Sequence, residues 1–243
     1  MLSRPASPTV RWIKCCALRG GDGIWHYARS NAAAIDRHWD AARLANAGYF
    51  NGVIHLIDDM TIDGAVLSAR LLRTDFKSYL YWRHHGFEEA GVLDGFGSAL
   101  IRSAGGAIIL GCQRPGNINA GLSYLPGGFI DARDAAPDGT IDLAASVWRE
   151  LAEETGLGPD DLVAGDGYYL TCDGAQVSLA LPVTARLSTG DLMDKIDRHL
   201  AADADPELAG IVAVRDVADI DGLAMAPYAR VLVSHLLSAA RPI

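Results

Sequence analysis

The sequence predicts an α/β protein in which a mixed β-sheet is covered by helices on both faces. Three observations lead to this prediction. Hydrophobic residues make up 50% of the 243 residues, which is enough to bury a substantial core. Apolar stretches of strand length recur along the chain, and several neighbouring stretches are separated by hairpin-type turns. Segments with helical periodicity stand between these strands, as expected for helices that pack on a sheet.

Residues 1–93 are predicted to form an N-terminal α/β extension without recognisable chemistry. Asn31 stands near the start of its first predicted helix and Gly48 just past the end. Gly86 closes the second predicted helix. The elements expected here are a strand over 9–18, a turn over 19–23, a helix over 31–48, a strand over 64–72 and a helix over 75–86.

Residues 94–243 are predicted to form a second domain, which carries the chemistry. It begins with two apolar strands joined by a Ser-Ala-Gly-Gly turn at 103–106, a hairpin signal. A loop rich in Gly, Pro and Asp at 121–139 leads into a helix over 142–156. The elements expected after it are strands over 166–172 and 176–187, a helix over 192–204, a strand over 209–217 and an amphipathic helix over 227–240.

The composition argues against several classes of protein. A formal net charge of −9 is unsuited to a nucleic-acid partner, since such binding needs a basic surface. No apolar run approaches the roughly 18 residues of a transmembrane helix, and the first residues lack the apolar core of a signal peptide. The four cysteines, Cys15, Cys16, Cys112 and Cys172, have neither CxxC spacing nor the density of a disulfide scaffold. We therefore expect a cytoplasmic protein with reduced cysteines and no membrane partner.

The stretch RELAEETGL, residues 149–157, concentrates three glutamates on a predicted helix. Glu150, Glu153 and Glu154 occupy positions i, i+3 and i+4, and therefore share one face. Like charges at this spacing destabilise a helix. Arg149 stands four residues before Glu153, close enough to pair with it. Either water screens these carboxylates on an ordinary solvated face, or a cation lies among them.

The neighbourhood of this helix favours the cation. Asp142 is expected to cap the N-terminus, and Gly156 to end the helix in a left-handed conformation. Three carboxylates on one face offer the hard oxygen donors that suit Mg²⁺ or Mn²⁺. The glycine-rich loop LPGGF, residues 125–129, comes shortly before the helix, and its backbone carbonyls could complete the coordination.

The helix and the loop together resemble the Nudix box, whose family pattern is G-x5-E-x7-R-E-U-x-E-E-x-G-U, with U an aliphatic residue. The matching positions are Gly128, Arg149, Glu150, Leu151, Glu153, Glu154, Gly156 and Leu157. Two features depart from the pattern. Gly128 and Arg149 are twenty-one residues apart where the family has fourteen, and the first family glutamate falls on Ile141. Both departures concern the loop before the helix rather than the three glutamates.

The resemblance covers about residues 95–240 and implies an α/β/α sandwich that hydrolyses a nucleoside diphosphate linked to another group. Divalent metals suit this reaction because they neutralise the diphosphate and lower the pKa of a bound water. Arg149 would hold a ligand glutamate in place, and Glu153 and Glu154 would be catalytic. The ligands that the resemblance implies for Mg²⁺ or Mn²⁺ are the Gly128 carbonyl, Glu150, Glu153 and Glu154.

The N-terminal region is similar to animal Nudix UDP-glucose diphosphatases in the order and the residue pattern of its segments. This likeness implies a UDP-sugar such as UDP-glucose as the substrate, and an extension that covers the substrate or forms a homodimer. ADP-ribose, a dinucleotide and coenzyme A remain alternative substrates. A catalytically silent Nudix domain that senses a ligand is an alternative of another class. The complete set of three glutamates favours an enzyme.

Two further residues are candidates for the site. Glu207 precedes a late strand, where the resemblance implies a metal ligand or the base for the attacking water; a surface acid is the other interpretation. Arg114 ends a strand before the box and is a candidate to bind the diphosphate of the ligand, with a solvated arginine as its alternative.

Overall fold

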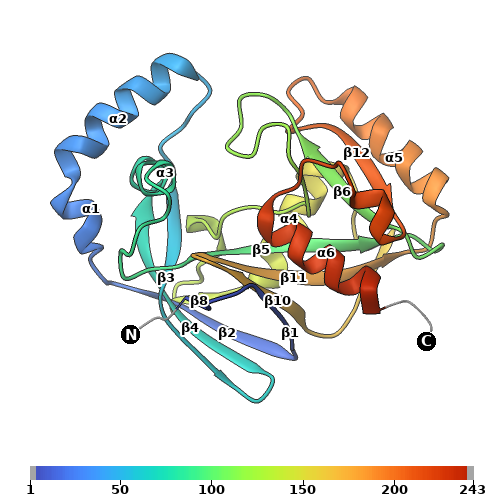
Figure 1. Ribbon diagram of the computed structural model, residues 1–243, viewed down its shortest axis with the longest axis horizontal. Coiled ribbons are helices and arrows are strands. Elements are labelled where there is room, and N and C mark those ends of the chain that lie inside the picture. The colour runs from blue at the N-terminus through green and yellow to red at the C-terminus, as the bar shows by residue number, and fades with distance from the viewer. Residues whose placement is uncertain (1–3, 240–243) are drawn as a thin grey trace.

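The computed structural model describes residues 4–239 as two β-sheets with helices packed against them (Figure 1). The larger sheet, sheet A, contains β1 (Thr9–Ile13), β5 (Asp94–Arg102), β6 (Ile108–Gln113), β7 (Ser123–Tyr124), β9 (Leu162–Ala164), β10 (Tyr168–Asp173), β11 (Gln176–Ala185) and β12 (Leu208–Val214). Its strand order is β1-β10-β11-β5-β6-β12, with β7 paired to β6 and β9 paired to β11. Strands β11 and β5 are parallel and the other pairs are antiparallel, so the sheet is mixed, as predicted.

Sheet A lies between helices on both faces, which confirms the predicted α/β/α arrangement (Figure 1). Helices α4 (Leu143–Thr155) and α5 (Thr189–Ala202) cover one face, and α6 (Pro227–Ala239) covers the other. Neighbouring residues of a strand point to opposite faces. Accordingly, Ile101 of β5 is buried with α4 and α5, whereas Leu100 is buried with α6. Residue 240, included in the predicted last helix, lies outside the described residues.

The smaller sheet, sheet B, has the order β3-β4-β2-β8. Its strands are β2 (Cys15–Gly21), β3 (Val53–Asp63), β4 (Val66–Asp75) and β8 (Thr140–Ile141). Three helices accompany it: α1 (His26–Ser30), α2 (Ala32–Ala45) and α3 (Phe76–His84). Asn31 occupies the N-cap position of α2, and Gly86 follows α3 with φ 74°, as predicted from the sequence. Helix α3 contributes Tyr79 and Trp82 to a buried aromatic cluster with Trp25.

The strand predicted over 9–18 is wrong as a single element, because the chain changes sheets at Lys14. Residues 9–13 pair with β10 in sheet A, and residues 15–21 pair with β4 in sheet B. The expected turn over 19–23 is also wrong in its first half, since Gly20 and Gly21 continue the pairing with β4. The sequence prediction missed β3, whose alternation is broken by a bulge between Ile57 and Asp59.

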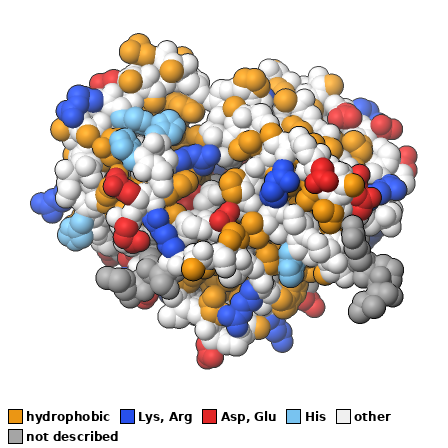
Figure 2. Space-filling model, viewed as in Figure 1, with side chains coloured by type: hydrophobic (Ala, Val, Ile, Leu, Met, Phe, Trp, Pro, Cys, Tyr) orange, Lys and Arg blue, Asp and Glu red, His pale blue; other side chains and the backbone are white. Residues whose placement is uncertain are grey.

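The two halves of the chain exchange strands. Strand β1 of the N-terminal region joins sheet A, and β8 of the C-terminal region joins sheet B beside β2. Each sheet therefore contains a strand from the other half of the chain, and the division into two domains at residues 1–93 and 94–243 stays a prediction. Within the described residues, no helix has the length and apolar character to cross a membrane. Acidic and basic side chains are interspersed over the described surface in view in Figure 2, with no continuous basic stripe on that face.

Candidate functional site

Helix α4 begins and ends at the predicted capping residues. The Asp142 carboxylate accepts a hydrogen bond from the Ala145 N–H at 3.0 Å, and Gly156 ends the helix with φ 67°. The helix lies tightly on β5, because a Cβ at Gly97 would be 2.7 Å from Val147 Cγ2. Capping and close packing therefore fix the position of the glutamates relative to sheet A.

The three glutamates of α4 stand in different environments. Glu154 is only 3% exposed, whereas the side chains of Glu150 and Glu153 are 14% and 50% exposed. A solvated charged face would expose all three carboxylates. That interpretation is therefore wrong for Glu154, which points into the protein.

Glu154 is held by two hydrogen bonds. Its Oε2 accepts from the Gly127 N–H at 2.8 Å, and its Oε1 accepts from the Tyr124 hydroxyl of β7. Burial raises the pKa of Glu154 to about 8; both hydrogen bonds oppose this rise, and the nearby Glu207 and Glu150 add to it. A buried carboxylate beside other carboxylates is costly unless a positive charge compensates it.

Glu150 lies against the backbone of the glycine-rich loop. A Cβ at Gly128 would stand 2.7 Å from the Glu150 Cδ, so only glycine leaves room for the carboxylate here. Burial raises the pKa of Glu150 to about 7, opposed by Arg149 and reinforced by Glu153 and Glu207. The structure thus brings together the Gly128 backbone and Glu150, both named as ligands from the sequence.

Arg149 does not pair with Glu153, which corrects the pairing expected from the i,i+4 spacing. Its guanidinium contacts Asp134 Oδ1 at 2.5 Å and Glu150 Oε1 at 3.1 Å. The half-exposed Glu153 lies 3.6 Å from Arg133 instead. The role implied for Arg149, holding a glutamate of the site in place, is therefore directed at Glu150.

The segment that lengthens the loop before the box supplies the second partner of Arg149. This segment forms a short 3-10 helix, η1 (Ala132–Asp134), and then β8. Asp134 is 7% exposed and accepts hydrogen bonds from Ser146 Oγ at 3.1 Å and the Asp131 N–H at 2.9 Å. Ile141, where the family pattern has glutamate, is buried in β8 and packs in the core. The insertion thus places an aspartate against Arg149.

We expect Arg149→Ala to lower the free energy of unfolding by about 3 kcal/mol, because it leaves Asp134 buried without a cation. For a chain of this size the midpoint of thermal unfolding should fall by roughly 6–12 °C. Arg133→Ala is the matched control: its side chain is 58% exposed, so the loss should stay below about 1 kcal/mol. Adding Asp134→Asn to Arg149→Ala should restore part of the stability. An unfolding midpoint within about 2 °C of wild type for Arg149→Ala would contradict the burial argument.

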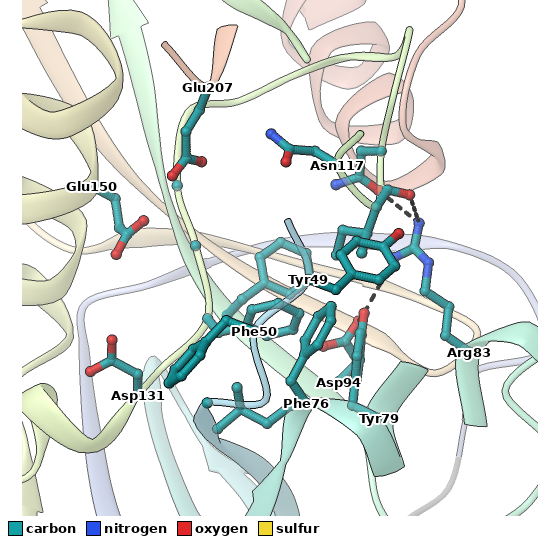
Figure 3. A pocket seen from close by; sticks show the side chains of 18 of the residues that line it. Tyr49, Phe50, Phe76, Tyr79, Arg83, Asp94, Asn117, Asp131, Glu150 and Glu207 are labelled. Carbon is teal, nitrogen blue, oxygen red and sulfur yellow. Dashed lines mark hydrogen bonds between the residues drawn. The ribbon is translucent and has the colours of Figure 1, made fainter. Parts of the chain in front are cut away.

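A cavity of about 720 Å³ opens beside the glutamate helix. In Figure 3, Glu150, Glu207 and Asp131 lie toward one side, Tyr79, Arg83 and Asp94 toward the other, and aromatic side chains between them. A cavity of this size, walled by aromatic rings with a few polar groups, is typical of a small-molecule site. One end is therefore anionic and the other aromatic and polar.

Glu207 lines this cavity just before β12. Burial raises its pKa, Glu153 adds to the rise, and Arg114 opposes it. Glu207 and Glu150 of α4 therefore line the same cavity. Arg114 pairs with Asp205 and is not among the residues that line the cavity. Its role in binding a diphosphate stays a prediction.

Sequence reasoning missed Arg133, which lines the cavity and contacts Asp131, Glu150 and Glu153 at 2.6, 3.8 and 3.6 Å. A cationic residue among acids in the lengthened loop, at FIDARD, is the signal that was available. It also missed Tyr124, whose hydrogen bond to Glu154 joins residues thirty positions apart.

The comparisons with known proteins find likeness only among solved structures: no protein-family model and no curated protein matches the sequence. The Nudix hydrolase RenU from M. smegmatis is 20% identical over 61% of this chain and 88% of its own, with a TM-score of 0.40. The MutT protein from Methanosarcina mazei Go1 is 22% identical over 60% and 95%, with a TM-score of 0.40. A bifunctional NMN adenylyltransferase/ADP ribose pyrophosphatase from Francisella tularensis is 16% identical over 66% and 45%, with a TM-score of 0.41. Likeness at this level leaves the site to be judged by its own geometry.

The oxygen atoms at the anionic end of the cavity are of the type that binds a divalent cation. Carboxylate and carbonyl oxygens are the ligands that Mg²⁺ and Mn²⁺ prefer. Glu150 and Glu154 have raised pKa values from burial and from Glu207, and a cation among them would oppose that rise. In the described part of the chain, no three His, Cys, Asp or Glu side chains already stand in an arrangement that holds a metal. The fit between these residues and a divalent cation is therefore one of donor atoms and charge.

Proposed function

We propose that this protein is a metal-dependent hydrolase that cleaves the diphosphate of a nucleoside diphosphate-linked compound. The observation that carries the proposal is that Glu150 and Glu207 line one end of a cavity large enough for such a ligand, while both are close enough to the buried Glu154 to raise its pKa. Glu154 itself is buried and held by hydrogen bonds rather than solvated. Carboxylates beside a cavity whose pKa values are raised by burial and by neighbouring carboxylates are typical of a functional site.

The proposed metal ligands are Glu150, Glu153, Glu154 and the Gly128 carbonyl. When bound, a divalent cation neutralises charge on the diphosphate and makes water a better nucleophile. Arg149 keeps Glu150 directed toward the site through its 3.1 Å contact. Arg133 brings a guanidinium to the same end of the cavity, where it can bind a phosphate oxygen.

Glu207 is proposed as the general base. Burial raises its pKa, which makes it a stronger base than an ordinary glutamate, and it lines the cavity on the same side as Glu150 in Figure 3. Glu207 removes a proton from the attacking water as the new oxygen–phosphorus bond forms. The bond between that phosphorus and the bridging oxygen breaks, and two phosphomonoesters leave.

The proposal predicts Mg²⁺- or Mn²⁺-dependent cleavage of at least one compound in a panel of UDP-glucose, ADP-ribose, a dinucleoside diphosphate and coenzyme A. Product analysis should show paired phosphomonoesters, such as UMP and glucose 1-phosphate from UDP-glucose. Excess chelator should abolish turnover, and added metal should restore it. Turnover that persists in chelator would contradict the metal chemistry. Thermal stabilisation by a panel compound without any cleavage would instead identify a ligand-sensing domain.

A further inference from the structure

The aromatic end of the cavity is built largely by the N-terminal region. The segment between α2 and β3 contributes Tyr49 and Phe50, and helix α3 contributes Phe76 and Tyr79. Phe129, the last residue of the glycine-rich loop, completes the wall. Its ring centroid lies 6.0 Å from that of Phe76 and 4.8 Å from that of Tyr79. Aromatic rings from both halves of the chain therefore enclose one volume.

Phe50 stands out among these rings because it is 81% exposed. A large apolar side chain exposed on a surface is common by itself. Here it lines the cavity and lies near Tyr49 and Phe76 in Figure 3, so its ring is free to cover a ligand in the cavity. A planar ring is the ligand group that gains most from such neighbours.

Asp94 supplies a polar group at this end, and it is only 1% exposed. Its Oδ2 accepts hydrogen bonds from the Tyr79 hydroxyl at 3.0 Å and from Gln176 Nε2 at 3.3 Å. Its Oδ1 has no hydrogen-bond partner among the described residues. A buried carboxylate oxygen without a donor is destabilising, and such groups in native proteins call for an explanation.

The nearest arginine does not neutralise Asp94 directly. Arg83 donates to the Tyr79 hydroxyl at 3.3 Å, to the Ile118 carbonyl at 3.1 Å and to Asn119 Oδ1 at 2.7 Å. These contacts hold Tyr79 and the loop after β6 in place. Asp94 therefore keeps an unused acceptor at the cavity wall, and an N–H or O–H group of a ligand can satisfy it.

We propose that the aromatic end of the cavity binds the nucleobase of the substrate, which stacks among Phe50, Phe76 and Phe129 and donates an N–H to Asp94. A phosphate is disfavoured at this position, because its charge would meet the buried carboxylate of Asp94. Aromatic rings around an acceptor favour a planar heterocycle with N–H groups over a sugar. The N-terminal region would thus select the base, while α4 carries the chemistry. The inference rests on the proposed function only in taking the ligand to be a nucleotide.

The first test compares ligands on the wild-type protein by calorimetry in excess chelator, so that it is independent of metal and turnover. Ribose 5-phosphate and the 5′-monophosphates of adenosine, guanosine, cytidine and uridine are titrated in turn. The best nucleotide should bind at least about tenfold more tightly than ribose 5-phosphate, because stacking adds to affinity. Equal affinity for ribose 5-phosphate and all four nucleotides would overturn the proposal.

The second test concerns the hydrogen bond to Asp94. Purine riboside 5′-monophosphate and pyrimidin-2-one riboside 5′-monophosphate keep the ring but carry no N–H donor on it. Replacing the best-bound base by the matching analogue should weaken binding about tenfold, as expected for a lost hydrogen bond to a charged group. Undiminished binding of the analogue would reject the role of Asp94.

Asp94→Asn should weaken binding of the best nucleotide by a similar factor and leave ribose 5-phosphate unaffected. Asp59→Asn is the matched control, because Asp59 is exposed on β3 and does not line the cavity. If Asp94→Asn fails to fold, the analogue comparison on the wild-type protein decides. Base-selective binding without hydrolysis of any panel compound would reject the proposed function alone. Hydrolysis with binding that ignores the base would reject this inference alone.

Discussion

Glu154→Gln should lower kcat by about 10³-fold, which corresponds to roughly 4 kcal/mol of lost transition-state stabilisation. The substitution removes one negative charge from the proposed metal site and keeps the size of the side chain. The fold should survive, because the glutamine oxygen can accept from the Gly127 N–H while its amide donates to the Tyr124 hydroxyl oxygen. Kinetics on the panel compound that the wild type cleaves would measure the loss.

Metal binding gives a second readout for the same variant. A cation that binds only the folded state raises the unfolding midpoint by mass action, so Mn²⁺ should stabilise the wild type and stabilise Glu154→Gln much less. Glu89→Gln is the matched control, since Glu89 is exposed and does not line the cavity. If Glu154→Gln keeps both the wild-type rate and the wild-type stabilisation by Mn²⁺, Glu154 is neither a ligand nor catalytic. Its burial would then have to be explained by the fold alone.

Local signals in the sequence were enough to predict the helix that carries the glutamates. Asp142 and Gly156 mark its ends through hydrogen bonds and backbone conformations that involve only their near neighbours in the chain. The hairpin of β5 and β6 and the helices α2 and α3 were predictable for the same reason. The mixed sheet between helices follows from these elements because their apolar faces have few ways to pack.

The parts that the sequence did not reveal depend on contacts between distant residues. Thr9 pairs with Cys172, so no local pattern could tell that the chain leaves sheet A at Lys14. The partner of Arg149 is Asp134 of the lengthened loop, and the i,i+4 rule could not find it. Spacing places Glu153 and Glu154 on one face, but only the packing of Tyr124 and the loop shows that Glu154 is buried.

Replacing the two neighbouring glycines of the loop by alanine should have different effects. Gly127→Ala should mainly lower stability, and Gly128→Ala should mainly lower activity. A Cβ at Gly127 would stand 2.6 Å from the Cα of Ser98 and closer still to the Gly97 carbonyl oxygen, both in the backbone of β5. Strand β5 is central in sheet A and cannot move aside. Gly127→Ala should therefore lower the free energy of unfolding by about 3 kcal/mol or more, with a fall of roughly 6–12 °C in the unfolding midpoint.

In Gly128→Ala, the added Cβ would contact a side chain instead of the backbone of a strand. The new Cβ would press on the Glu150 carboxylate, which is the far end of a flexible side chain and can swing away. The unfolding midpoint should change by only about 2–4 °C, the equivalent of about 1 kcal/mol. Activity should nevertheless fall by about 10- to 100-fold, because Glu150 leaves the position in which Arg149 holds it, and small misplacements in a site are costly. Thermal unfolding and kinetics on both variants separate the two roles. A Gly128→Ala protein with full activity would remove Glu150 from the proposed metal site, and a Gly127→Ala protein as stable as wild type would show that the loop can lift from β5.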